Sequence, residues 1–121
     1  MPGPLIVLAE DNVDLRALLS NALEASGYRI VQAETGAPLA AVVRSLASSG
    51  ENVRVVITDV RTPQQGGVES LRSIGAHTPL ILMTSYSDAW THGQAAAVGA
   101  TLIDKPLRIS ELRDAVKQAL K

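Results

Sequence analysis

The chain has 121 residues, a length that suits one domain, and we take residues 1–121 as that domain. Hydrophobic residues make up 46%, the formal net charge is −1 and cysteine is absent. This composition excludes disulfides and thiolate metal sites, and it gives no electrostatic case for direct binding of nucleic acid or an anionic membrane. The apolar runs are too short to span a membrane, and the N-terminus lacks the pattern of a signal peptide. We therefore expect a soluble cytoplasmic domain.

Short apolar runs alternate with helical patterns along the chain. Leucines share one face of a helix from Leu15 onward, and Gly27 stands where that helix is expected to stop. The apolar runs lie at 5–8, 28–31, 55–58, 80–83 and 101–103, and the helical patterns at 15–22, 39–46, 66–75, 88–98 and 112–119. Runs this short and this apolar predict strands that are buried on both faces. The helix 88–98 contains Gly93 and has an inner face of mostly alanine, so we expect it to pack lightly.

Strict alternation of strands and helices predicts the α/β class, with a parallel sheet covered by helices on both faces. We expect one doubly wound, flavodoxin-like sheet of five strands in the order 2-1-3-4-5, with five helices. This order places the less hydrophobic second strand at one edge and the short fifth strand at the other. Ligands of such sheets bind outside the carboxyl ends of the strands, where the strand order reverses.

Polar residues follow four of the predicted strands at those ends. They are Glu10 and Asp11 after the first strand, Asp59 after the third, Thr84 and Ser85 after the fourth, and Asp104, Lys105 and Pro106 after the fifth. Because the first and third strands are neighbours in this order, three carboxylates converge, and such a cluster favours a cation such as Mg²⁺. Lys105 and Thr84 are suited to bind phosphate oxygens, and an aspartate can accept a phosphoryl group. The pattern indicates phosphoryl transfer onto Asp59.

Each of these residues taken alone also has a structural interpretation. Glu10, Asp11 and Asn12 could cap the first helix, and capping explains Glu10 and Asp11 at least as well as metal binding does. Asp59 could cap the turn that follows it, and Lys105 could be an ordinary surface lysine. The functional interpretation depends on their combination at one end of the sheet. His77 and His92 are assigned no role.

Four motifs and their spacing give the sequence a family resemblance. They are "AEDN" at 9–12, "TDVRTPQQGG" at 58–67, "MTS" at 83–85 and "DKP" at 104–106. With these motifs, the chain from Leu5 to Leu120 resembles the receiver domain of two-component response regulators, of the chemotaxis-regulator type. The resemblance implies a signalling switch rather than an enzyme, although such a domain assists its own phosphorylation and dephosphorylation.

The resemblance also implies a role for each matched residue. Asp59 is the expected phosphoacceptor, and Thr84 and Lys105 are expected to hold its phosphoryl oxygens. The Mg²⁺ ligands implied are Asp59, Asp11, Glu10 through water, and the backbone carbonyl of Arg61. The Lys105–Pro106 peptide bond is expected to be cis, and Pro63 and Gly67 are expected to form the turn after the acceptor.

Partners follow from the same resemblance. The expected phosphoryl donor is a sensor histidine kinase, a phosphotransfer protein or a small acyl phosphate. The output is a downstream protein or a domain outside this chain, and both a stand-alone regulator and a part of a longer one remain open. In the family, the face formed by the helix 88–98, the fifth strand and the last helix is a common dimer surface. Leu102 stands where the family often has a switch aromatic, and Tyr86 or Trp90 are candidate substitutes.

Three other functions are consistent with parts of the sequence. A receiver-like interaction module that is never phosphorylated is the main alternative, and Leu102 mildly favours it. A flavin or nucleotide binder of this fold would need a phosphate-cradling loop after the first strand, but "AEDNVD" is acidic there. A hydrolase with an aspartyl-phosphate intermediate would need a cap domain around its substrate, and the chain has none.

Overall fold

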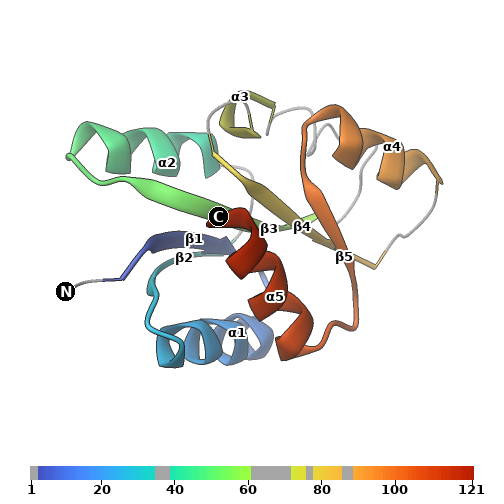
Figure 1. The fold of residues 1–121 in the computed structure, drawn as a ribbon, viewed down its shortest axis with the longest axis horizontal. Helices are drawn as coiled ribbons and strands as arrows, with labels where there is room; N and C mark the ends of the chain where they lie inside the picture. Colours follow the sequence, from blue (N-terminus) through green and yellow to red (C-terminus); the bar gives the residue numbers. More distant parts are fainter. Residues whose placement is uncertain (1–2, 35–38, 61–71, 76–77, 86–88) are drawn as a thin grey trace.

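The structure is a computed structural model that describes residues 3–34, 39–60, 72–75, 78–85 and 89–121. In this part of the chain, five parallel strands form one sheet in the order β2-β1-β3-β4-β5, with five helices around it (Figure 1). The strands are β1 (Leu5–Ala9), β2 (Arg29–Ala33), β3 (Val53–Val60), β4 (Leu80–Thr84) and β5 (Thr101–Asp104). The helices are α1 (Val13–Ala25), α2 (Leu39–Ser48), α3 (Arg72–Gly75), α4 (Ala89–Ala97) and α5 (Ile109–Ala119). The predicted fold class and strand order are confirmed.

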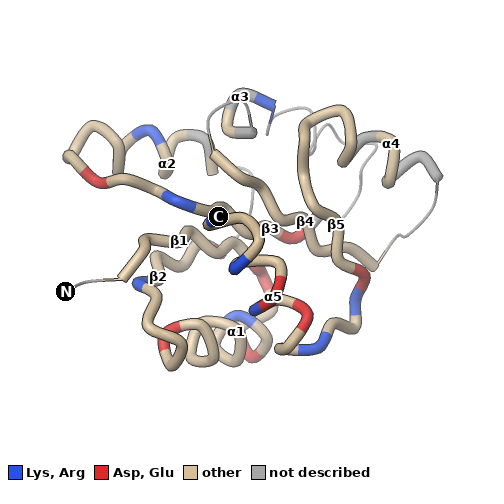
Figure 2. The backbone as a smooth tube through the Cα atoms, viewed as in Figure 1, with Lys and Arg blue, Asp and Glu red and all other residues tan. Residues whose placement is uncertain are grey.

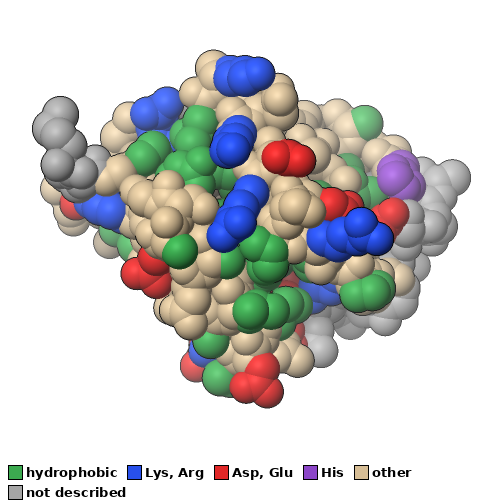
Figure 3. Space-filling model, turned by 60° about the horizontal axis from the view of Figure 1, so that its bottom comes forward, with side chains coloured by type: hydrophobic (Ala, Val, Ile, Leu, Met, Phe, Trp, Pro, Cys, Tyr) green, Lys and Arg blue, Asp and Glu red, His purple; other side chains and the backbone are tan. Residues whose placement is uncertain are grey.

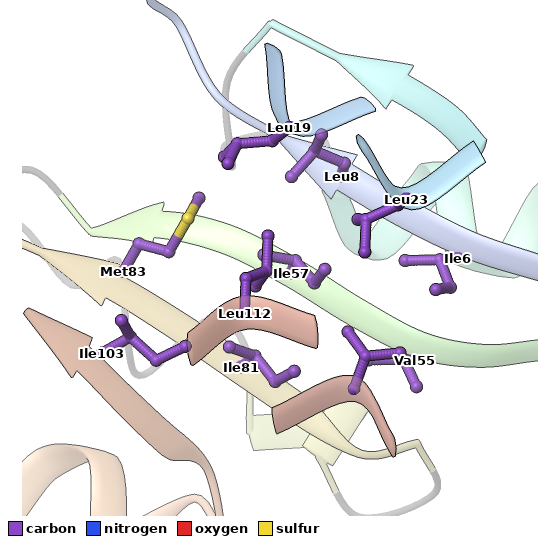
Figure 4. Close-up of a cluster of buried hydrophobic side chains, with 11 residues drawn as sticks. Ile6, Leu8, Leu19, Leu23, Val55, Ile57, Ile81, Met83, Ile103 and Leu112 are labelled. Atoms are coloured by element: carbon purple, nitrogen blue, oxygen red, sulfur yellow. The ribbon is translucent and has the colours of Figure 1, made fainter. Parts of the chain in front are cut away.

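Helices cover both faces of the sheet, which explains why the strands are so uniformly apolar. Every residue of β1 and β4 is buried. On one face, α1 and α5 pack onto the sheet through Leu19, Leu23, Leu112 and Val116 (Figure 4). On the other face lie α2, α3 and α4 (Figure 1). Burial of side chains from alternate strand positions into these two clusters supplies the main stabilisation of the fold.

The outer strands differ from the inner ones as their sequences predict. β2 lies at one edge and has no fully buried residue: Arg29 and Gln32 are exposed and the other three residues are half-buried. β5 lies at the other edge and has four residues, of which Ile103 is buried. The first helix stops where Gly27 predicts, with Ser26 as its C-cap and Gly27 at a φ of 96°. A positive φ of this size costs glycine little because it has no Cβ.

Strand pairing extends several strands beyond their apolar runs. Asp59, Thr84 and Asp104 were expected just after strands, but they lie within β3, β4 and β5. Asp59 pairs with Met83, and Thr84 pairs with Asp104, so the backbone ladder continues to the polar ends. Backbone hydrogen bonding sets the length of a strand, whereas the hydropathy pattern reports only its buried part. Most of the helix predicted at 66–75 lies outside the described residues, which include α3 over Arg72–Gly75.

Charged residues of both signs are interspersed along the chain and over the surface (Figures 2 and 3). The face of α1 and α5 shows apolar, basic and acidic side chains side by side (Figure 3). This distribution agrees with the formal net charge of −1 and with the absence of a large basic surface among the described residues on that face. Within the described ranges, the helices are too short or too polar to cross a membrane.

Candidate functional site

Three carboxylates converge at the carboxyl ends of β1 and β3. Glu10 and Asp11 directly follow β1, and Asp59 is the penultimate residue of β3, the neighbour of β1 in the sheet. One carboxylate oxygen from each of the three lies within 4.8 Å of the other two. Glu10 is fully buried, while Asp11 and Asp59 are partly exposed. The sequence predicted this convergence, which follows from the strand order.

Lys105 brings a positive charge into this cluster from β5, the far edge of the sheet. Its Nζ donates to Glu10 Oε1 at 2.6 Å and lies 3.0 Å from Asp59 Oδ1. The backbone N–H of Lys105 donates to the carbonyl of Thr84 at 2.7 Å, which extends the pairing of β4 and β5 by one residue. The Lys105–Pro106 peptide bond is cis, as predicted. Lys105 is thus a member of the site and not an ordinary surface lysine.

Burial and charge shift the pKa values of Glu10 and Lys105. Burial away from water raises the pKa of the Glu10 carboxyl above its ordinary value, and the neighbouring Asp11 and Asp59 act in the same direction. Hydrogen bonds from Lys105 and from the backbone N–H of Asn12 oppose this shift in part. Burial alone would lower the pKa of Lys105, but its hydrogen bonds to Glu10 and Asp59 outweigh this effect and raise it. Lys105 therefore stays protonated beside the carboxylates.

In the loop between β1 and α1, Asn12 caps the helix, whereas Glu10 belongs to the acidic cluster. Asn12 is the N-cap of α1, and its Oδ1 accepts from the backbone N–H of Leu15 at 2.9 Å. Glu10 does not cap that helix turn; its Oε2 accepts from the backbone N–H of Asn12 at 3.1 Å. The capping alternative therefore applies to Asn12, and the Glu10 carboxylate lies in the acidic cluster.

Thr84 lies at the same end of the sheet. It is the last residue of β4, it is fully buried, and it pairs with Val60 of β3 and Asp104 of β5. Leu102 is half-buried and packs on the cluster under α4, on the other side from α5. Several predicted residues lie outside the described part of the chain: Arg61, Pro63, Gly67, His77 and Tyr86. The side chain of Trp90 is not described either, and His92 is exposed on α4.

One contact at this site was not predicted from the sequence. Arg16, in the second turn of α1, donates from Nη1 to the backbone carbonyl of Glu10 at 2.8 Å. No apolar period or motif signals such a contact. The only available hint was a basic residue one helix turn beyond the acidic "EDN" stretch.

The donor set fits a hard divalent cation. Oxygen ligands from carboxylates are what Mg²⁺ prefers, together with water and phosphate oxygens. Glu10, Asp11 and Asp59 provide three such groups around one point, and the partial exposure of Asp11 and Asp59 leaves room for solvent. A sequence-predicted magnesium site thus agrees with the arrangement of the three side chains.

Comparison with known proteins identifies the family. The sequence model of the response regulator receiver domain matches residues 6–117. This chain belongs to the family of response regulator receiver domains, the phosphoacceptor modules of two-component signalling. Proteins of this family bind Mg²⁺ at an acidic pocket, and the cluster of Glu10, Asp11 and Asp59 corresponds to such a pocket.

Two curated relatives and one solved structure illustrate the similarity. Regulatory protein AtoC of Escherichia coli (strain K12) is 33% identical over 120 residues, and the match covers 96% of this chain but 24% of AtoC. Sporulation initiation phosphotransferase F of Bacillus subtilis (strain 168) is 30% identical over 124 residues, covering 99% of this chain and 96% of that protein. The crystal structure of a response regulator from Thermotoga maritima superposes with a TM-score of 0.81 at 21% identity, covering 98% of both chains. The chain thus spans about a quarter of one relative and nearly all of the other.

Proposed function

We propose that this receiver domain is a phosphorylation-dependent switch whose phosphoacceptor is Asp59. One observation carries the proposal: Asp59 shares a cluster with two further carboxylates, and the ammonium of Lys105 lies 3.0 Å from its Oδ1. A structural ion pair would need one carboxylate, whereas here Lys105 contacts two, and an oxygen of the third, Asp11, lies within 4.8 Å of an oxygen of each of them. Membership of the receiver family supports the same role.

The reaction follows from the positions of these side chains. A carboxylate oxygen of Asp59 attacks the phosphorus of a phosphohistidine, so that an O–P bond forms while the P–N bond breaks. The imidazole leaves with the electron pair of that bond. Lys105, held by Glu10 at 2.6 Å, offers its ammonium to an oxygen of the transferred group. Thr84, at the end of the neighbouring strand, offers a hydroxyl to another. Bound Mg²⁺ supplies further positive charge for the phosphoryl oxygens.

The metal ligands proposed are Asp11 directly, Glu10 through water, Asp59, and the backbone carbonyl of Arg61. Arg61 lies outside the described residues, so its part rests on the "TDVR" motif alone. The geometry supports the other three residues as ligands, because one carboxylate oxygen from each lies within 4.8 Å of the other two. Their role in binding Mg²⁺ is a prediction for the experiment below.

We propose that the phosphoryl donor is a histidine kinase or a phosphotransfer protein. The output partner that responds to phosphorylation is another protein or a further domain. Two large apolar side chains on α1, Val13 and Leu18, are 64% and 56% exposed, and α1 directly follows the loop that carries Glu10 and Asp11. Such side chains offer a donor protein contact area beside the acceptor. A homodimer through α4, β5 and α5, a cytoplasmic location and one domain over residues 1–121 remain proposals from the family resemblance and the composition.

A receiver-like interaction module without phosphorylation is the second candidate. The observation in its favour is Leu102, which occupies the position of the family's frequent switch aromatic and packs on the cluster under α4. Because leucine has no aromatic ring, we expect the coupling between Thr84 and the output face to be weaker here, or to run differently, than is usual in the family. The intact acidic cluster argues for the phosphorylation switch instead.

Mass spectrometry of the intact protein after incubation with acetyl phosphate tests the proposal. We expect a gain of one phosphoryl group in Mg²⁺, and no gain in EDTA or in Asp59→Asn. Glu111→Gln, an exposed change on α5, is the matched control and should be phosphorylated like the wild type. A protein that neither gains the group from acetyl phosphate or a kinase panel nor binds Mg²⁺ would leave the interaction module as its function.

A further inference from the structure

Arg16 connects helix α1 to the strand end that carries the acidic cluster. Its guanidinium uses two different nitrogens. Nη1 donates to the carbonyl oxygen of Glu10 at 2.8 Å, and Nε donates to Oε1 of Gln32 on β2 at 3.3 Å. A guanidinium presents its donors in a planar fork, so that one side chain can bind two acceptors at a set angle. Arg16 therefore ties three elements together at one point.

The carbonyl of Glu10 needs a partner because it lies just beyond the paired part of the sheet. The ladder between β1 and β2 ends at Ala9, and the N–H of Glu10 makes one further bond, to the carbonyl of Ala33 at 3.0 Å. Glu10 is fully buried, and a buried carbonyl without a hydrogen bond is costly. With Arg16 on its carbonyl and Ala33 on its N–H, the residue is held on both sides.

A second set of hydrogen bonds holds the partner of Arg16. Nε2 of Gln32 donates to Oγ of Ser20 at 3.1 Å, and that hydroxyl donates to Oε1 of Glu24 at 3.3 Å. Ser20 is fully buried between α1 and the sheet. The orientation of the Gln32 amide is thus set by α1 itself, and the guanidinium of Arg16 meets a fixed acceptor.

We propose that Arg16 is a positioning residue for the acidic cluster: by clamping the Glu10 carbonyl, it sets the direction in which Glu10 and Asp11 present their carboxylates to Mg²⁺. This inference rests on the proposed function of the site. Groups that orient metal ligands without touching the metal commonly change affinity by about tenfold or more when they are lost. Arg16 acts on the backbone between two ligands and contacts neither the metal position nor the phosphoryl acceptor.

The matched pair Arg16→Met and Arg29→Met tests the proposal. Arg29 makes the same kind of contact at the opposite end of β2, where its Nε donates to the backbone carbonyl of Gly3 at 2.9 Å. Mg²⁺ affinity is measured by calorimetry in the unphosphorylated protein, and phosphorylation by acetyl phosphate is followed as a function of Mg²⁺ concentration. We expect Arg16→Met to weaken Mg²⁺ binding about tenfold. Its maximal rate at saturating Mg²⁺ should stay within about twofold of the wild type, because the acceptor is untouched. Arg29→Met should leave both quantities unchanged.

Equal Mg²⁺ affinities of Arg16→Met and Arg29→Met would overturn the proposal. So would a loss of maximal rate in Arg16→Met at unchanged Mg²⁺ affinity. If Arg16→Met does not fold, Arg16→Lys decides, because one ammonium cannot serve both acceptors in the same geometry. Several-fold weaker Mg²⁺ binding by Arg16→Lys supports the clamp, and wild-type affinity overturns it. A wild-type protein that binds Mg²⁺ but takes up no phosphoryl group from acetyl phosphate or from a kinase panel contradicts the proposed function, while the affinities still decide the role of Arg16.

Discussion

At the scale of single residues, Lys105 is what allows acidic side chains to lie so close together. Its ammonium contacts Glu10 and Asp59 at 2.6 and 3.0 Å, from 95 positions away in sequence from Glu10. Glu10 lies inside the protein, so its charge depends on this lysine and on the N–H of Asn12. A buried carboxylate with these partners links the stability of the fold to pH.

Glu10→Gln tests this link. The pKa of Glu10 is raised above its ordinary value of 4.5, chiefly by burial, so the folded protein keeps this proton to higher pH than the unfolded chain does. The resulting stabilisation is complete below pH 4.5 and is lost as the pH rises through the raised pKa of the folded state. Glutamine does not titrate. We therefore expect the free energy of unfolding of Glu10→Gln, relative to the wild type, to increase over this rise in pH.

Urea unfolding in EDTA at several values from about pH 4 to pH 7 measures the difference in the free energy of unfolding between Glu10→Gln and the wild type. The range starts near the ordinary carboxyl pKa, where the unfolded chain titrates. The chelator is needed because a bound cation would itself stabilise the ionised carboxylates. Asp114→Asn serves as the control, since that residue is exposed on α5. A difference between Glu10→Gln and wild type that stays constant with pH would contradict the raised pKa of Glu10.

At the scale of elements, α4 has few large apolar side chains among those that the structure describes. The described residues that it places against the sheet are small: Ala95 is buried, and Val98 follows directly after the helix end. Gly93 lies in the middle of the helix, exposed, and a Cβ built there meets nothing within 4 Å. Weak packing and a central glycine both lower the stability of this element relative to α1 and α5.

Gly93→Ala is expected to stabilise the protein by about 0.5–1 kcal/mol, because alanine loses less backbone entropy than glycine in a helix. Urea denaturation gives the change in free energy. Gly99→Ala is the matched control: that glycine has a φ of 72°, so the same substitution should destabilise the protein by about 1 kcal/mol. Stabilisation by both changes, or by neither, would show that backbone conformation does not decide their effects.

At the scale of the whole molecule, the two faces of one sheet contribute side chains to two hydrophobic clusters. Ile57 and Met83 point to the side of α1 and α5 (Figure 4), while Val56 and Leu82 belong to the cluster on the opposite face. Adjacent positions of the same strands thus build both clusters. Because neither cluster can form without the sheet, we expect residues 1–121 to unfold in one cooperative transition.

Ile57→Ala tests this expectation. Ile57 is fully buried in the central strand, and its truncation should lower the free energy of unfolding by about 2–5 kcal/mol. Arg54→Ala, an exposed position of the same strand, should change it by less than about 0.5 kcal/mol. Circular dichroism and near-ultraviolet absorbance should report the same transition midpoint in every variant. Separate midpoints for the two probes would contradict a single cooperative transition.

In the described part of the chain, local sequence was enough to predict which segments become strands and helices, and which polar residues stand at the ends of the strands. It could do so because both kinds of information are local: apolar period selects the element, and chain direction puts every carboxyl end of a parallel sheet on the same side. The cluster of Glu10, Asp11 and Asp59 was predictable for this reason once a strand order was assumed. Strand ends were predicted too early at Asp59 and Thr84, because pairing of the backbone, and not hydropathy, sets them.

Which of these polar groups contact one another depends on the folded arrangement and could not be predicted from local sequence. The reach of Lys105 to Glu10 and the clamp of Arg16 on the Glu10 carbonyl depend on how β5 and α1 lie against β1. Both contacts join a long basic side chain to a residue that no local pattern relates to it. Packing also sets the different roles of two residues in "EDN": Asn12 caps the helix, and Glu10 is buried in the site. A buried charge such as that of Glu10 needs a partner, and burial is a property of the folded chain.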